Sequence, residues 1–123
     1  MKYTISKEFH FEASHRLIAL PPGHPCTRPH GHSYVLRVDL ESTELVPPGF
    51  VQDYKQLDPI KQFIDSEFDH QDLNEVFESL NPGVETTAEN IAKCIFDRFV
   101  EQFPLISAVH VSETRKSLAS FLR

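Results

Sequence analysis

The sequence of 123 residues has little cysteine, no tryptophan and no block of basic residues. Cys26 and Cys94 are too few for a disulfide scaffold, and in a reducing compartment both are expected to be free thiols. The net charge of −6, without clustered Lys and Arg, argues against a nucleic-acid binder. No apolar run is long enough for a secretory signal or a membrane span. We therefore expect a cytoplasmic protein with no nucleic-acid or membrane partner.

A chain of 123 residues is long enough for one folded domain but not for two, so we expect a single domain that spans residues 1–123. Hydrophobic residues make up 40% of the chain and can supply a core. Apolar and polar residues alternate over residues 3–14 and 32–43, which predicts two strands that pair antiparallel. Shorter strands are predicted over 106–113 and 117–122, whereas Pro and Gly make 17–29 a loop.

Helical spacing predicts two helices between these pairs of strands. Asp58 and Pro59 suit the start of the first, which carries Ile60, Phe63, Ile64 and Phe68. Either Thr86 or Thr87 can cap the second, whose apolar stripe is Ala88, Ile91, Ala92, Ile95 and Phe99. The order strand, strand, helix, helix, strand, strand predicts an α+β fold, with a four-stranded antiparallel sheet and two helices on one face. The open edges of such a sheet invite pairing between subunits.

Three histidines are placed to share a metal ion. His30 and His32 are two residues apart, so in an extended chain they project to the same face. His15 continues the apolar phase of the first strand at its far end. If the two strands form an antiparallel pair, the three imidazoles converge at one rim of the sheet. Three nitrogen ligands with an open fourth position are typical of catalytic zinc, although copper or nickel also binds imidazole.

The loop before His30 and the end of the first helix carry further reactive groups. Cys26 near a divalent cation could serve as a base, or as a fourth ligand that closes a structural zinc site. Asp69 and His70 could form a proton relay, although adjacency alone equally suits a helix end. Strand phase turns Glu113 toward the core side, where a carboxylate needs a cationic or donating partner.

Taken together, these segments resemble the 6-pyruvoyltetrahydropterin synthase superfamily over nearly the whole chain. The matching motifs, in order, are FHFEASHRL (9–17), GHPCTRPHGH (23–32), DHQDLN (69–74), TAEN (87–90) and SET (112–114). The short gap between Cys26 and His30 is most similar to the bacterial 6-carboxy-5,6,7,8-tetrahydropterin synthase branch. Thr86 departs from the Pro that many bacterial members have before this Thr, which weakens the assignment of Thr87.

The resemblance implies a tunnelling fold, in which subunits join their sheets into a barrel and trimers stack into a homohexamer with sites at subunit boundaries. It implies that His15, His30 and His32 bind Zn²⁺. It further implies Cys26 as general base, with Asp69 and His70 as a paired relay. Glu113 would anchor the pterin edge, and Thr87 would help to seat the pterin.

The implied activity is that of a carbon–carbon lyase in 7-deazapurine (queuosine) biosynthesis. It would convert 7,8-dihydroneopterin triphosphate to 6-carboxy-5,6,7,8-tetrahydropterin, with release of acetaldehyde and triphosphate. One alternative is a 6-pyruvoyltetrahydropterin synthase, which eliminates triphosphate without cutting a carbon–carbon bond. Another is a non-catalytic, zinc-stabilised oligomeric binding module, which predicts that Cys26 ligates zinc and that Asp69 and His70 have no role.

Overall fold

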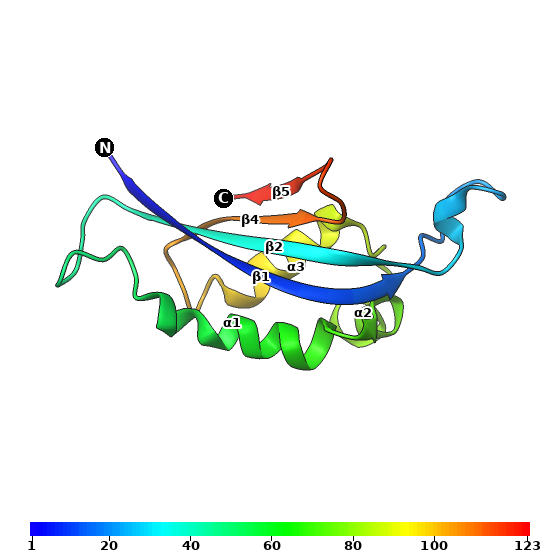
Figure 1. The fold of residues 1–123 in the computed structure, drawn as a ribbon, viewed down its shortest axis with the longest axis horizontal. Helices are drawn as coiled ribbons and strands as arrows, with labels where there is room; N and C mark the ends of the chain where they lie inside the picture. Colours follow the sequence, from blue (N-terminus) through cyan, green and yellow to red (C-terminus); the bar gives the residue numbers. More distant parts are fainter.

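The alternating segments near the amino terminus form two long antiparallel strands, β1 (Tyr3–His15) and β2 (His30–Ser42), in a computed structural model that describes residues 1–123 (Figure 1). Their register runs from the pair Tyr3 and Ser42 to the pair His15 and His30. The strand β4 (Ile106–Ser112) pairs antiparallel with β2, and β5 (Ala119–Leu122) pairs antiparallel with β4. The four predicted strands are therefore present, with ends that differ from prediction by at most two residues.

The predicted four-stranded antiparallel sheet is wrong in one respect. A fifth strand, β3 (Gln71–Asp72), pairs parallel with β1 at Ala13 and Ser14 and gives the sheet order β3-β1-β2-β4-β5. A two-residue strand shows no alternation of its own, and its pairing depends on where the preceding helix delivers the chain. The sheet is consequently mixed.

Helices cover a single face of the sheet, as predicted (Figure 1). The first predicted helix is a 3₁₀ turn, Tyr54–Leu57, followed by α1 (Asp58–Phe63) and a π-helical turn, Ile64–Phe68. The second is α3 (Ala88–Phe99), which packs against β4 and β5. No helix combines the length and apolar character that crossing a membrane requires.

The prediction of two helices is also wrong, since the structure has a third, α2 (Leu73–Leu80), between them. Asp72 caps this helix by accepting a hydrogen bond from the amide of Asn74 (2.9 Å). Its buried residues are only Leu73 and Phe77, which are too few to establish a helical period in the sequence. Because α2 follows β3 directly, it fixes the end of the sheet where the three histidines lie.

The core lies between the helices and the inner face of the sheet, and it contains 25 buried apolar residues. Each long strand contributes alternate residues to it, among them Phe9, Phe11, Tyr34, Leu36 and Val38. The outer face carries the polar set, which includes Glu12, Ser33 and Asp39. Since residues two apart share a face, the apolar row on β1 ends at His15, and the row on β2 begins with His30 and His32.

Candidate active site

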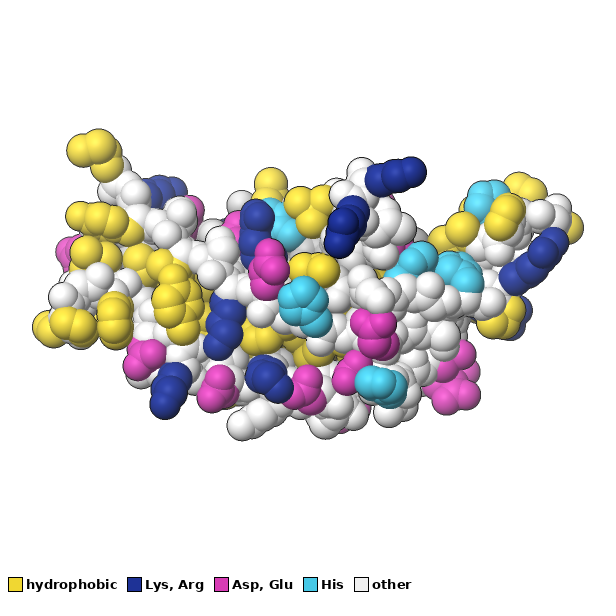
Figure 2. All heavy atoms as spheres, in the orientation of Figure 1, with side chains coloured by type: hydrophobic (Ala, Val, Ile, Leu, Met, Phe, Trp, Pro, Cys, Tyr) yellow, Lys and Arg dark blue, Asp and Glu magenta, His cyan; other side chains and the backbone are white.

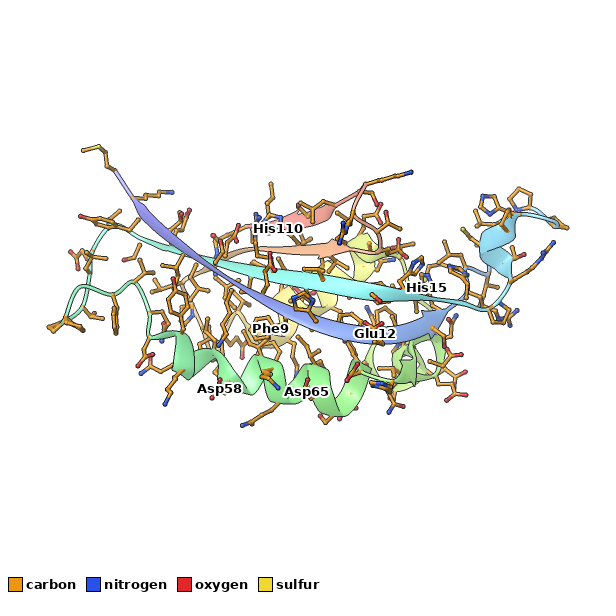
Figure 3. The ribbon with its side chains drawn as sticks, in the orientation of Figure 1. Phe9, Glu12, His15, Asp58, Asp65 and His110 are labelled. Carbon is orange, nitrogen blue, oxygen red and sulfur yellow. The ribbon has the colours of Figure 1, made fainter.

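Three imidazoles converge where β1 ends and β2 begins (Figure 3 labels His15). His15, His30 and His32 each offer one ligand atom, and these atoms lie within 4.8 Å of one another. Between His30 and His32, a Cβ at Gly31 would lie 3.3 Å from the carbonyl oxygen of Ala13, so glycine suits the close approach of β1 and β2 here. The predicted convergence of the three rings at one rim of the sheet is therefore observed.

Backbone carbonyls fix the tautomers of two of these rings. Nδ1 of His15 lies 2.8 Å from the carbonyl oxygen of Thr86, and Nδ1 of His30 lies 2.8 Å from that of Arg28. A carbonyl only accepts, so each Nδ1 carries the proton and each Nε2 presents a lone pair. The buried Nε2 of His15 has no hydrogen-bond partner. Protonated Nδ1 atoms held by the backbone and an unsatisfied Nε2 fit a metal ion such as zinc.

Glu113 reaches this cluster from the end of β4. Its Oε2 lies 3.1 Å from Nε2 of His15 and 3.2 Å from Nε2 of His32, although the former contact lacks hydrogen-bond alignment. The two imidazoles, His15 foremost, hold the pKa of Glu113 below its ordinary value. Burial lowers the pKa of His15, but Glu113 and the Thr86 carbonyl outweigh it and raise that pKa. Burial keeps the pKa of His32 low, which favours the neutral form that a metal ligand needs.

Asp69 and His70 lie in ion-pair contact at the edge of β1. Oδ2 of Asp69 lies 3.0 Å from Nδ1 of His70, while Oδ1 accepts a hydrogen bond from the amide of Glu12 (2.8 Å). His70 adopts a left-handed backbone conformation (φ 60°), which is uncommon for a residue other than glycine. The pKa of Asp69 is held below its ordinary value, mainly by the hydrogen bond from the Glu12 amide and to a smaller extent by His70. Nε2 of His70 has no such contact, and the side chain is 77% exposed.

Cys26 and Thr87 lie on segments that flank the histidines. Cys26 is half-buried in a 3₁₀ turn, Pro25–Thr27, on a loop that projects beyond the end of β1 and β2 (Figure 1). It does not belong to the group of ligand atoms that the three histidines form within one chain. Thr87, rather than Thr86, caps α3, since its Oγ1 accepts a hydrogen bond from the amide of Asn90 (3.2 Å). Its own O–H remains able to donate.

One residue of the site was not expected from the sequence. Thr86 is buried (1% exposed) and holds His15 through its carbonyl oxygen and, at 3.2 Å, through Oγ1. The sequence offers no signal for this role, because the contact spans 71 residues and its main partner is a backbone atom. A Pro at position 86 could still supply the carbonyl, so the departure of Thr86 from the family pattern leaves this contact possible.

Comparisons with known proteins agree with this arrangement. A sequence model for the family described as 6-pyruvoyl tetrahydropterin synthase matches residues 4–123. A 6-carboxy-5,6,7,8-tetrahydropterin synthase of Synechocystis sp. is 35% identical over 130 residues, covering 97% of this chain and 92% of that protein. One of the same name from Aquifex aeolicus is 31% identical over 102 residues, covering 72% of this chain and 63% of that protein.

A solved structure shares the fold over the full length. The 6-pyruvoyl tetrahydropterin synthase of Caenorhabditis elegans superposes with a TM-score of 0.85 at 26% identity, covering 100% of this chain and 96% of that chain. The match of the family model to nearly every residue, together with this superposition, settles the classification. The chain belongs to the 6-pyruvoyl tetrahydropterin synthase family.

Proposed function

We propose that this protein is a zinc-dependent lyase that converts 7,8-dihydroneopterin triphosphate to 6-carboxy-5,6,7,8-tetrahydropterin, with release of acetaldehyde and triphosphate, in queuosine biosynthesis. The observation that carries the proposal is the convergence of His15, His30 and His32 in a member of this family. Two relatives that match most of this chain bear the name of the carboxy-forming synthase.

Three protein ligands leave a fourth coordination position for substrate. Zinc held by His15, His30 and His32 would supply Lewis-acid stabilisation of the negative charge that develops on the substrate side chain when a neighbouring C–H bond is deprotonated. His15 and His30 are oriented for such binding before the metal arrives, since the carbonyls of Thr86 and Arg28 already hold their Nδ1 protons.

The proton transfers are assigned to two groups. Cys26 is assigned as the general base that takes the proton from the substrate carbon. His70 returns protons through Nε2, while Asp69 holds the opposite ring nitrogen at 3.0 Å and so fixes the tautomer. Glu113 anchors the amino edge of the pterin. Its two carboxylate oxygens can accept a pair of hydrogen bonds from the N–H groups of that edge. Thr87 contributes a hydroxyl donor.

We infer that these groups form a complete site only when more than one copy of the chain assembles. Cys26 and the Asp69–His70 pair do not join the group of ligand atoms that the histidines form within one chain. The sheet has an exposed edge at β5, where Leu122 is 65% exposed, and pairing with a neighbouring sheet would cover it. We therefore include a homo-oligomer, a hexamer built as a dimer of trimers, in the proposal.

The test is to incubate the zinc-loaded protein with 7,8-dihydroneopterin triphosphate and to identify the products by mass spectrometry. Acetaldehyde and 6-carboxytetrahydropterin in equal amounts are expected, and the protein stripped of metal by a chelator should form neither. Triphosphate release with a pyruvoyl product would instead identify the biopterin-type synthase. Absence of any product, with Cys26 ligated to zinc, would identify a non-catalytic module.

A further inference from the structure

The loop that carries Cys26 depends on two side chains from elsewhere in the chain. Residues 16–27 leave the end of β1 and project away from the sheet (Figure 1). Apart from the bond from the amide of the next residue, Arg28, to the carbonyl of Pro25, the hydrogen bonds that join these residues to the rest of the protein have Asn74 or Glu85 as their partner. A segment this rich in Pro and Gly has few other means of keeping one conformation, so these two side chains determine how well the loop is ordered.

Asn74 and Glu85 hold successive parts of the loop. Asn74, in the first turn of α2, accepts from the amide of Arg16 and donates to its carbonyl, both at 2.9 Å. Farther out, the amide of Ile18 donates to both carboxylate oxygens of Glu85 (3.1 and 3.0 Å), and the amide of Ala19 donates to Oε1 (3.0 Å). Hydrogen bonds to a carboxylate are stronger than those between neutral groups.

Cys26 is coupled directly to the part of the loop that Glu85 holds. The amide of Leu17, next to Ile18, donates to the carbonyl of Cys26 (2.8 Å). The turn around Cys26 is further closed by His24, whose Nδ1 accepts from the amide of Cys26 (3.1 Å). A displacement of Ile18 and Ala19 would therefore carry the turn with it.

The same short segment also holds the metal-ligand histidine. Thr86, which follows Glu85, fixes Nδ1 of His15 through its carbonyl. The carbonyl of Glu85 in turn accepts from Nδ2 of Asn90 (3.0 Å), in the first turn of α3. One anchored dipeptide thus contacts both the ring of His15 and the loop that bears the thiol.

We propose that Glu85 is a positioning residue that sets the place of the Cys26 loop relative to the histidine cluster through the amides of Ile18 and Ala19. The inference deepens the proposed function, since it assumes that Cys26 acts as the base. Glu85 touches neither metal nor substrate in this assignment. Its effect is expected on the rate of the proton transfer and not on the binding of zinc.

The experiment compares Glu85→Ala, Glu85→Gln and Glu78→Ala in the full-length protein. Glu78 is a matched control, because it lines the same cavity of about 380 Å³ as Glu85 but makes no hydrogen bond to the loop. Hydrogen exchange reports the amides of Leu17, Ile18 and Ala19. Alkylation by iodoacetamide, followed by peptide mass spectrometry, reports Cys26, with Cys94 on α3 as an internal reference. Zinc content, kcat and KM complete the set.

In Glu85→Ala we expect faster exchange of the loop amides, faster alkylation of Cys26 and a fall in kcat of about 10- to 100-fold, because small displacements of a reacting group are costly. KM, zinc content and the alkylation of Cys94 should stay within about twofold of the wild type. Glu85→Gln should restore most of kcat, since its single carbonyl oxygen can accept from both Ile18 and Ala19 as Oε1 does.

Three results would overturn the inference: unchanged exchange and alkylation in Glu85→Ala, a loss of kcat equal to that of Glu78→Ala, or a loss of kcat that follows loss of zinc. Failure of the proposed function is distinguishable from these results. If the wild type forms no pterin product, the proposed reaction is wrong, while exchange and Cys26 alkylation still decide whether Glu85 holds the loop.

Discussion

The thiol of Cys26 has two possible roles that a single substitution separates. If Cys26 is the general base, Cys26→Ala should retain one zinc per chain and lose about 10²- to 10⁴-fold in kcat, the usual worth of a positioned base. Metal analysis and steady-state kinetics measure both effects. The control is Cys94→Ala, because Cys94 lies within α3 and burial raises the pKa of its thiol, which disfavours the thiolate. Loss of zinc in Cys26→Ala would identify a fourth ligand instead.

Glu113 presents a similar choice between substrate and metal. Its Oε2 lies within 3.2 Å of Nε2 of both His15 and His32, so it could face a bound pterin or bind the ion itself. As a pterin anchor, Glu113→Gln should keep its zinc and raise KM by about 10-fold or more, since a charged hydrogen bond contributes about 1.5–3 kcal/mol. Titration with a zinc chelator checks the metal. A drop of 100-fold in zinc affinity would contradict the anchor assignment.

Much of this site follows from residue spacing. The alternation of His30 and His32, with His15 in phase on the neighbouring strand, is enough to predict that three rings meet once the strands pair. The contacts of Thr86 and Glu85 are not predictable in this way, because they join backbone groups to residues 66 to 71 positions away. The contact between Asp69 and His70 occurs beside a residue with positive φ, His70, and the local sequence does not predict that conformation.

At the scale of elements, a row of polar side chains crosses the outer face of the sheet. We call Ser6, Arg37, Asp39, His110 and Ser120 the cross-strand network. Asp39 on β2 accepts from Ser6 on β1 (2.7 Å) and from Nε2 of His110 on β4 (2.7 Å). His110, labelled in Figure 3 well away from His15, then reaches Ser120 on β5 through Nδ1 (2.6 Å). The network links the four antiparallel strands β1, β2, β4 and β5 in one register.

The network predicts a pH dependence of stability. Burial raises the pKa of Asp39, but hydrogen bonds from Ser6, His110 and Arg37 outweigh it and hold the pKa below its ordinary 3.8. A depressed carboxyl pKa stabilises the fold above the unfolded value and loses that stability as pH falls through the folded one. Asp39→Asn should therefore cost about 1–3 kcal/mol at pH 7 and flatten the decline of stability below about pH 4.

Urea unfolding between pH 3 and 7 measures this difference. The matched control is Asp97→Asn, whose carboxylate pairs with Lys93 on an exposed helix surface and is 54% exposed. An exposed pair of this kind contributes at most about 0.5 kcal/mol. Equal losses in the two variants would show that the cross-strand network adds nothing beyond an ordinary surface ion pair.

The sequence predicts the long elements better than the short ones. β1 and β2 each alternate over 13 residues, so their ends and faces could be read within two positions. β3 and α2 escaped prediction because the first has two residues and the second buries only Leu73 and Phe77. Their positions depend on the π-helical turn at Ile64–Phe68, which delivers the chain to the edge of β1. Long-range placement of this kind leaves no local period.

At the scale of the whole molecule, the charges are distributed unevenly around the site. The chain has a net charge of −6, and Lys2, Lys7, Arg37, Lys61 and Lys93 pair with carboxylates. Arg28, Arg115 and Lys116 are among the cations whose side chains have no ion pair, hydrogen bond or aromatic partner, as are Arg16 and Lys55. Arg28 lies two residues before His30, and the other two follow Glu113 in the turn to β5. Figure 2 shows histidines between basic side chains at this end of the molecule.

Unpaired cations beside the histidines would attract a polyanionic substrate to a protein whose overall charge repels it. We therefore expect KM for dihydroneopterin triphosphate to rise as salt is increased from 50 to 500 mM, with kcat nearly constant, because screening weakens exposed charges. The double variant Arg115→Ala/Lys116→Ala should raise KM by about 10-fold at low salt and reduce its salt dependence. The control is Lys61→Ala, which also removes one positive charge, but one that is paired with Asp65 on the helical face. It should leave KM and its salt dependence unchanged. If the double variant keeps the KM and the salt dependence of the wild type, the triphosphate must be held by other groups, and the asymmetry of charge then has no part in substrate capture.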